Sequence, residues 1–193
     1  MAEITEATRA RFDREVAKYP ADQKQSAVMA CLAIVQHEQG HVTLHSEQAI
    51  ADHLGMPAIA VHEVTTFYNM YNQQTVGRFK LNVCTNLPCQ LRGGQHALHH
   101  LEQRLGVAMG ETTADGVFTL QQSECLGACA DAPVLLVNDR TMCSFMSNDK
   151  LDQLVEGLRK AGEMSAARPP EGARAPSGGS ERHEVRERGG KEQ

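Results

Sequence analysis

The sequence predicts an α+β chain in two parts: a bundle of helices, then a small α/β unit built on a four-stranded mixed sheet. Two observations carry this prediction. In residues 1–73, apolar side chains recur every three to four positions, which is the period of an amphipathic helix. From about residue 76 they alternate over short runs bounded by turn residues, as in strands. Residues 74–162 should form the sheet-containing part, and residues 163–193, rich in Pro, Gly and Ser, a disordered tail.

Four helices are expected in residues 1–73. Proline cannot continue a helix, and glycine favours the left-handed conformation that follows a helix C-terminus. The residues of this kind that should end the first three helices are Pro20, Gly40 and Gly55. Capping side chains, or a proline in the first turn, mark the starts of the later three helices. The residues expected in these roles are Asp22 with Gln25, then Ser46, then Pro57.

The second part should follow the order β-α-β-β-β-α. The expected strands are 78–83, 117–122, 133–137 and 140–145. A helix should open at Gly93-Gly94, and Ser147 should cap the last helix. This order predicts a small sheet of mixed direction with helices packed on it.

Composition and charge exclude several function classes. The net charge is −5, with no basic run in the expected folded part and no tryptophan, which argues against nucleic acid as a partner. No stretch reaches the roughly 18 apolar residues of a membrane span. The N-terminus has no basic segment followed by an apolar block, so a secretory signal is not expected. Cytosolic thiols stay reduced, so the six cysteines point to metal or redox chemistry.

Four cysteines form two local pairs, each just after an expected strand. Cys84 and Cys89 have four residues between them, and Cys125 and Cys129 have three. A 2Fe–2S cluster needs two thiolates on each of its irons, which such pairs supply. A structural zinc site built from the same four thiolates is the alternative, although zinc sites usually show two residues between paired cysteines. Spacing leaves both interpretations open.

Other candidate residues are set aside. His37 and His41 stand in a His-Glu-x-x-His pattern typical of zinc proteases, but that pattern needs a continuous helix and Gly40 interrupts it. Cys31 lies in an apolar helix and is expected to be a small buried hydrophobe. Cys143 lies in an expected strand with no cysteine close in sequence, so it stays outside the ligand set.

Longer motifs carry a family resemblance. The segments 64–71 (VTTFYNMY), 83–89 (VCTNLPC), 110–116 (GETTADG) and 124–133 (ECLGACADAP) resemble the family of E subunits of NADH:quinone oxidoreductase, respiratory complex I. The resemblance extends over about residues 3 to 162. It implies a helical bundle followed by a thioredoxin-like ferredoxin domain, in agreement with the element order expected from the pattern of apolar residues.

The resemblance also implies a function. One 2Fe–2S cluster would be held by Cys84, Cys89, Cys125 and Cys129 and would exchange single electrons with flavin. FMN and NADH would belong to a partner flavoprotein, so this component of an NADH dehydrogenase and translocase would have no catalytic residues of its own. Together with other peripheral-arm subunits it would lie in the cytoplasm, at the inner face of the cell membrane, without direct membrane insertion.

Two alternatives remain open. Related subunits occur in NAD-dependent formate dehydrogenases and bidirectional hydrogenases, where the same chain would act as a diaphorase subunit. A zinc-stabilised interaction module without a redox role is the alternative from another functional class.

Overall fold

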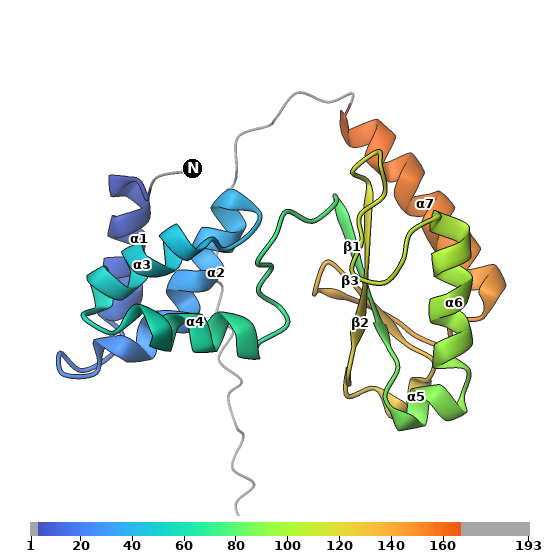
Figure 1. Ribbon diagram of the computed structural model, residues 1–193, viewed down its shortest axis with the longest axis horizontal. Coiled ribbons are helices and arrows are strands. Elements are labelled where there is room, and N and C mark those ends of the chain that lie inside the picture. The colour runs from blue at the N-terminus through green and yellow to red at the C-terminus, as the bar shows by residue number, and fades with distance from the viewer. Residues whose placement is uncertain (1–3, 167–193) are drawn as a thin grey trace, which may run out of the picture.

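The structure is a computed structural model that describes residues 4–166. Figure 1 shows a group of helices on one side and a sheet flanked by helices on the other, joined by an extended segment. The last helix continues to Ala166, so it extends a few residues into the segment expected to be a tail. The rest of that expected tail, 167–193, lies outside the described residues.

The helical part contains the four expected helices and one short 3-10 helix. Their bounds are α1 Glu6–Val16, η1 Lys24–Ala27, α2 Val28–Gln39, α3 Leu44–Leu54 and α4 Ala58–Phe67. Gly40 and Gly55 follow α2 and α3 with φ of 79° and 66°, so both expected helix ends are confirmed. Phe12 and Ile50 lie in the shared apolar core of this part and are fully buried.

Two of the expected helix starts are wrong. Thr43, rather than Ser46, caps α3, because its hydroxyl accepts a hydrogen bond from the Ser46 N–H at 3.1 Å. Ser46 already lies in the first turn of this helix. Asp22 caps no helix, because the chain enters the short η1 after Gln23, and neither η1 nor α2 has a side-chain cap.

The second part has the expected order with two extra helical elements, the short helix α5 and the 3-10 helix η2. Its elements are β1 Phe79–Cys84, α5 Leu87–Leu91, α6 Gly94–Leu105, β2 Phe118–Ser123, η2 Cys129–Asp131, β3 Leu135–Val137, β4 Thr141–Cys143 and α7 Asn148–Ala166. The strand order is β2-β1-β3-β4, with β1 parallel to β2, and β3 antiparallel to both β1 and β4. The predicted mixed, thioredoxin-like sheet is therefore confirmed.

The two faces of the sheet differ in what covers them. Helices α6 and α7 lie against one face (Figure 1), where Leu81, Phe118 and Leu120 form an apolar core. Alternation predicts a half-buried β1, yet Lys80 on its polar side is only 2 % exposed and Asn82 only 6 %. The polar face is buried because the segment that joins the two parts and the turn after β3 lie over it. Within residues 4–166, no helix has the length and hydrophobicity needed to cross a bilayer.

Candidate metal centre

The two cysteine loops leave the sheet at the same edge. Cys84 is the last residue of β1, and its partner in the parallel β1–β2 ladder is Ser123, the last residue of β2. Cys125 follows two residues later. Because the carboxyl ends of parallel strands meet at one edge of a sheet, both loops start side by side. The main chain also connects them, since the Thr85 N–H donates to the Ser123 carbonyl at 3.2 Å.

The first loop holds two buried thiols next to each other. Cys84 is 2 % exposed and Cys89, in the short helix α5, is 1 % exposed. Burial raises the pKa of the Cys89 thiol, and a hydrogen bond with the Cys84 thiol raises it further. A main-chain hydrogen bond from Val134 acts in the opposite direction. The Cys89 thiol is thus held in its neutral form, and binding of a metal would have to release its proton.

Gly94 brings the start of α6 onto this loop. A Cβ atom at residue 94 would stand 2.8 Å from the Cys84 carbonyl oxygen and 2.9 Å from that of Cys89. Real Cβ atoms do not approach main-chain oxygens so closely, so only glycine permits this packing. The main chain of both cysteines is therefore held in place by a helix terminus pressed against it.

The second loop presents its thiols to solvent. Cys125 and Cys129 are exposed, and Gly127 between them has a φ of 71°, which favours glycine. Its N–H donates to the Cys125 sulfur at 3.4 Å, a contact that stabilises negative charge on that sulfur. The Cys84 thiol in turn lies 3.9 Å from the carbonyl oxygen of Glu124, so each loop contacts the other close to its cysteines.

The contacts among the four predicted ligands centre on Cys89. Cys84 and Cys89 are in contact, and charge on Cys84 or Cys129 raises the pKa of Cys89, so these three thiols lie within electrostatic reach of one another. Among the side chains that the structure describes, no three His, Cys, Asp or Glu residues converge on a point where one metal ion would bind. A 2Fe–2S cluster needs two thiolates per iron. One buried pair and one exposed pair, with glycines at both loops, fit such a group.

The other candidate residues lie elsewhere. Helix α2 ends before Gly40, and the Glu38 carboxylate accepts a hydrogen bond from the Thr8 hydroxyl at 2.7 Å, so the His-Glu-x-x-His pattern builds no protease site. Cys31 is fully buried in the helical core, where burial raises its pKa to about 12. Cys143 lies in the edge strand β4, and burial raises its pKa as well.

Sequence reasoning missed the helix inside the first cysteine loop. Asn86 precedes α5 in an extended conformation, and Pro88 occupies its first turn. Asparagine just before a helix with proline at its start is a helix-start pattern, so the signal was present in the sequence. The close approach at Gly94 could not be predicted in the same way, because it depends on where α6 lies relative to both cysteines.

Comparison with known proteins identifies the family. Residues 12–159 match the model of the thioredoxin-like 2Fe–2S ferredoxin family. The chain is 40 % identical over 168 residues to the second E subunit of NADH-quinone oxidoreductase from Rhizobium meliloti, a match that covers 84 % of this chain and 98 % of the relative. It is 36 % identical over 148 residues to NADH-quinone oxidoreductase subunit 2 of Thermus thermophilus, covering 77 % and 82 % of the two chains.

A solved structure shares the fold. An NAD⁺-reducing NiFe-hydrogenase in the air-oxidised state matches with a TM-score of 0.60 at 18 % identity, and the match covers 72 % of this chain and 24 % of that one. This likeness concerns the fold alone. The family match and the relatives go further: this chain belongs to the thioredoxin-like 2Fe–2S ferredoxin family, together with the E subunits of bacterial NADH-quinone oxidoreductases.

Proposed function

We propose that Cys84, Cys89, Cys125 and Cys129 hold the 2Fe–2S cluster, with one local pair on each iron. The observation that carries this proposal is the start of both cysteine loops at the ends of neighbouring parallel strands. The buried pair supplies a rigid anchor, and the exposed pair faces the surface. When bound, the cluster accepts and releases one electron at a time.

The chain's own residues limit where that electron goes. The two thiols of the first loop are buried, whereas the two thiols of the second loop are open to solvent. A redox partner should therefore approach from the side of Cys125 and Cys129. The relatives are named as subunits of NADH-quinone oxidoreductases, so we place this chain as the electron-transfer subunit of such a complex. The partner is the flavoprotein subunit, whose FMN would exchange single electrons with the cluster and which binds NADH.

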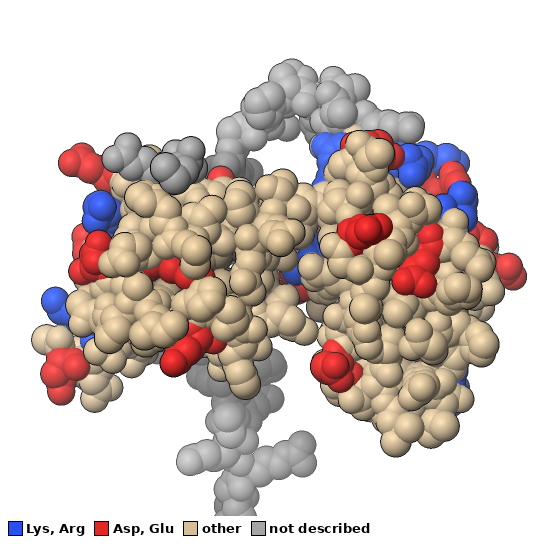
Figure 2. All heavy atoms as spheres, in the orientation of Figure 1, with Lys and Arg blue, Asp and Glu red and all other residues tan. Residues whose placement is uncertain are grey.

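The surface beside the first loop is suited to a protein partner. Leu87 and Leu91 of α5 are 63 % and 78 % exposed. In Figure 2 the lower end of the sheet-containing part, where α5 lies in Figure 1, shows few Lys, Arg, Asp or Glu atoms. Exposed apolar side chains in a surface poor in charge are typical of a protein interface. Contact there, with other peripheral-arm subunits nearby, would hold the chain at the inner, cytoplasmic face of the membrane.

The respiratory complex is favoured over the related holoenzymes. Identity of 36–40 % to oxidoreductase subunits supports it, while the hydrogenase likeness at 18 % concerns the fold alone. The alternative from another functional class is a zinc-stabilised interaction module, so an experiment has to distinguish a zinc site from a 2Fe–2S cluster.

The test is anaerobic purification of the full chain, followed by iron and sulfide analysis and low-temperature EPR after dithionite reduction. We expect two irons and two sulfides per chain, a visible band that bleaches on reduction, and one S = 1/2 signal. Addition of the flavoprotein and NADH should reduce the same centre. A colourless chain with one zinc and no signal would refute the proposal.

A further inference from the structure

The helical part and the sheet-containing part have separate apolar cores. One core lies among α1–α4, and the other lies between the sheet and helices α6 and α7. The two parts meet through the connector, residues 68–78, which runs from the end of α4 to the start of β1 (Figure 1). Domains joined by a small polar interface move relative to one another unless specific contacts hold them. The contacts made by the connector therefore decide how the parts are oriented.

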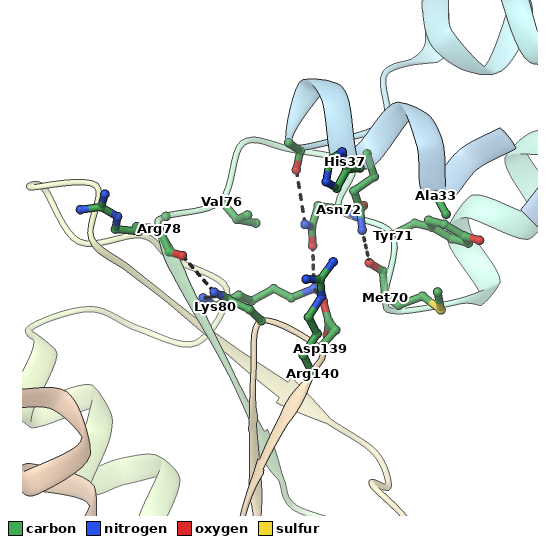
Figure 3. Close-up of a pocket in the computed structure, with 14 residues that line it drawn as sticks. Ala33, His37, Met70, Tyr71, Asn72, Val76, Arg78, Lys80, Asp139 and Arg140 are labelled. Carbon is green, nitrogen blue, oxygen red and sulfur yellow. Dashed lines mark hydrogen bonds and ion pairs between the residues drawn. The ribbon is translucent and has the colours of Figure 1, made fainter. Parts of the chain in front are cut away.

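Asn72 in the connector bonds to both parts at once. Its N–H donates to the Gln36 side chain at 2.6 Å, and its carbonyl accepts from the Val42 N–H at 2.7 Å. Its side-chain amide donates to the Gly40 carbonyl at 3.5 Å. These three bonds attach it to the end of α2 and the loop that follows. Its side-chain oxygen points the other way and accepts from the Lys80 ammonium at 2.7 Å, as Figure 3 shows.

Lys80 is in turn held firmly on the sheet. Its ammonium lies 2.6 Å from a carboxylate oxygen of Asp139, and the second oxygen of that carboxylate accepts from Asn82 at 2.6 Å. Its main-chain N–H donates to the Asn138 side chain at 2.7 Å. A buried ammonium is costly unless it is paired and hydrogen-bonded, so this side chain has little freedom to turn elsewhere.

Apolar packing does not fill the space around this contact. A cavity of about 460 Å³ lies beside it, lined by His37 of the helical part, by Tyr71 of the connector, and by Lys80 and Arg140 of the sheet-containing part. Figure 3 shows these residues around the opening. Because the joint is hollow, its polar contacts have to set the orientation. The connector makes other contacts with the sheet-containing part: the Asn69 amide donates to the Ser123 hydroxyl at 3.5 Å, at the edge of the second cysteine loop, and the Gly77 N–H donates to the Thr119 hydroxyl at 2.6 Å, next to β1.

We propose that the contact between Asn72 and Lys80 is an orienting lock. It holds the helical part in one orientation on the sheet-containing part, and breaking it lets the two parts turn relative to each other while each stays folded. Asn72 keeps its main-chain bonds to the helical part in any variant, so loss of its side chain frees the joint without unfolding α2.

The lock also bears on docking. Phe67, at the end of α4, is 80 % exposed on the helical part, and Leu91 is 78 % exposed on the sheet-containing part. A partner that contacts both residues binds best when their separation does not fluctuate, because ordering on association weakens affinity. This consequence rests on the proposed function, whereas the lock itself does not.

The test uses residual dipolar couplings of the oxidised, ¹⁵N-labelled full chain. Amides of α1–α4 and amides of the sheet should fit one alignment tensor in the wild type. In Asn72→Ala they should require two, with the alignment of one part reduced about twofold as it moves. Asn72→Asp keeps an oxygen for Lys80 and should restore one tensor. Gln74→Ala changes an exposed residue of the same connector and is the matched control, so its amides should also fit one alignment tensor.

A second variant guards against local effects at residue 72. Lys80→Met combined with Asp139→Asn removes the ammonium without leaving a half-buried carboxylate that has lost its cationic partner, and should also give two tensors. A single tensor in both this variant and Asn72→Ala would overturn the lock, as would two tensors in the wild type.

The affinity of Asn72→Ala for the flavoprotein should fall about tenfold while its EPR signal stays unchanged. Unchanged affinity of Asn72→Ala would overturn the docking consequence but not the lock. Absence of the EPR signal from the wild type would overturn the proposed cluster but not the lock.

Discussion

Gly94 and Cys89 are in main-chain contact: a Cβ atom added at Gly94 would lie 3.0 Å from the Cys89 carbonyl carbon and 2.9 Å from its oxygen. Alanine favours helix over glycine by about 1 kcal/mol in a helix interior. At this position the clash with rigid main chain outweighs that gain. We expect Gly94→Ala to push the first cysteine loop away, to lower the iron content per chain and to reduce thermal stability. Iron analysis and thermal unfolding measure both.

The matched control for this change is Gly157→Ala. Gly157 lies in α7, where an added Cβ would meet no atom within 4 Å, so alanine there should keep full iron content and raise stability by up to about 1 kcal/mol. Equal behaviour of the two variants would mean that the close approach at Gly94 has no bearing on the cysteine loop.

The ligand set predicts a contrast between two serine variants. Cys125→Ser removes a proposed ligand and should abolish or shift the EPR signal, because an alcohol replaces a thiolate on one iron. Cys143→Ser changes a thiol in edge strand β4, outside the proposed set, and should leave the spectrum as it is. EPR of both variants at equal protein concentration decides the matter. A normal spectrum from Cys125→Ser, with loss of signal in Cys143→Ser, would mean that Cys143 rather than Cys125 is a cluster ligand.

Thiol reactivity should follow burial and pKa. Only the thiolate is alkylated. Cys31 is fully buried and its pKa is raised to about 12, so even at pH 9 about 0.1 % of it is ionised, rising as the pH rises. In the chain stripped of metal, iodoacetamide should label the exposed Cys125 and Cys129 first and Cys31 last.

In the chain that holds its cluster, the four ligands should resist alkylation and Cys143 should react before Cys31. Peptide mapping by mass spectrometry at timed intervals gives the order in both states. Labelling of Cys31 as fast as Cys125 would show that the helical core opens readily. Equal labelling of Cys125 in both states would argue against its role as a ligand.

Docking should depend on the exposed leucine of α5. Leu91→Glu places a charge in a surface poor in charge, which should weaken binding to the flavoprotein about tenfold or more. The cluster spectrum should not change, because the Leu91 side chain is 78 % exposed. Leu44→Glu, at a residue 73 % exposed on α3, is the control and should bind normally. Surface plasmon resonance with immobilised flavoprotein gives both affinities, and equal losses would remove α5 from the interface.

Local signals predicted much of this fold. Gly40 and Gly55 end their helices as expected, because a left-handed residue after a helix is a property of a few consecutive positions. The sequence likewise predicts the strand that ends at Cys84 and the loop after it, because the period of apolar residues changes there from three or four positions to two and turn residues follow. Two local pairs of cysteines can also be seen in the sequence, whereas their role as cluster ligands stays a proposal.

Features that depend on distant segments could not be predicted. Lys80 looks like a solvent-facing strand residue, and only the positions of Asn72 and Asp139 show why it is buried. The Asp22 capping pattern failed because such short patterns also occur where no helix starts. At Gly94 the sequence predicts a helix start, but not that the same glycine supports both cysteines of the first loop.

The pairing of Cys84 with Ser123 means that the main chain, rather than the side chains, sets the distance between the starts of the two cysteine loops. Neighbouring strands lie about 4.8 Å apart whatever residues they carry, so the spacing of the two thiol-bearing loops is inherited from the peptide backbone. Side chains nearby can change over evolution without altering that spacing. A shift of β2 by one residue would move its loop by about 3.3 Å and turn its side chains to the opposite face, and no substitution at the loops would compensate.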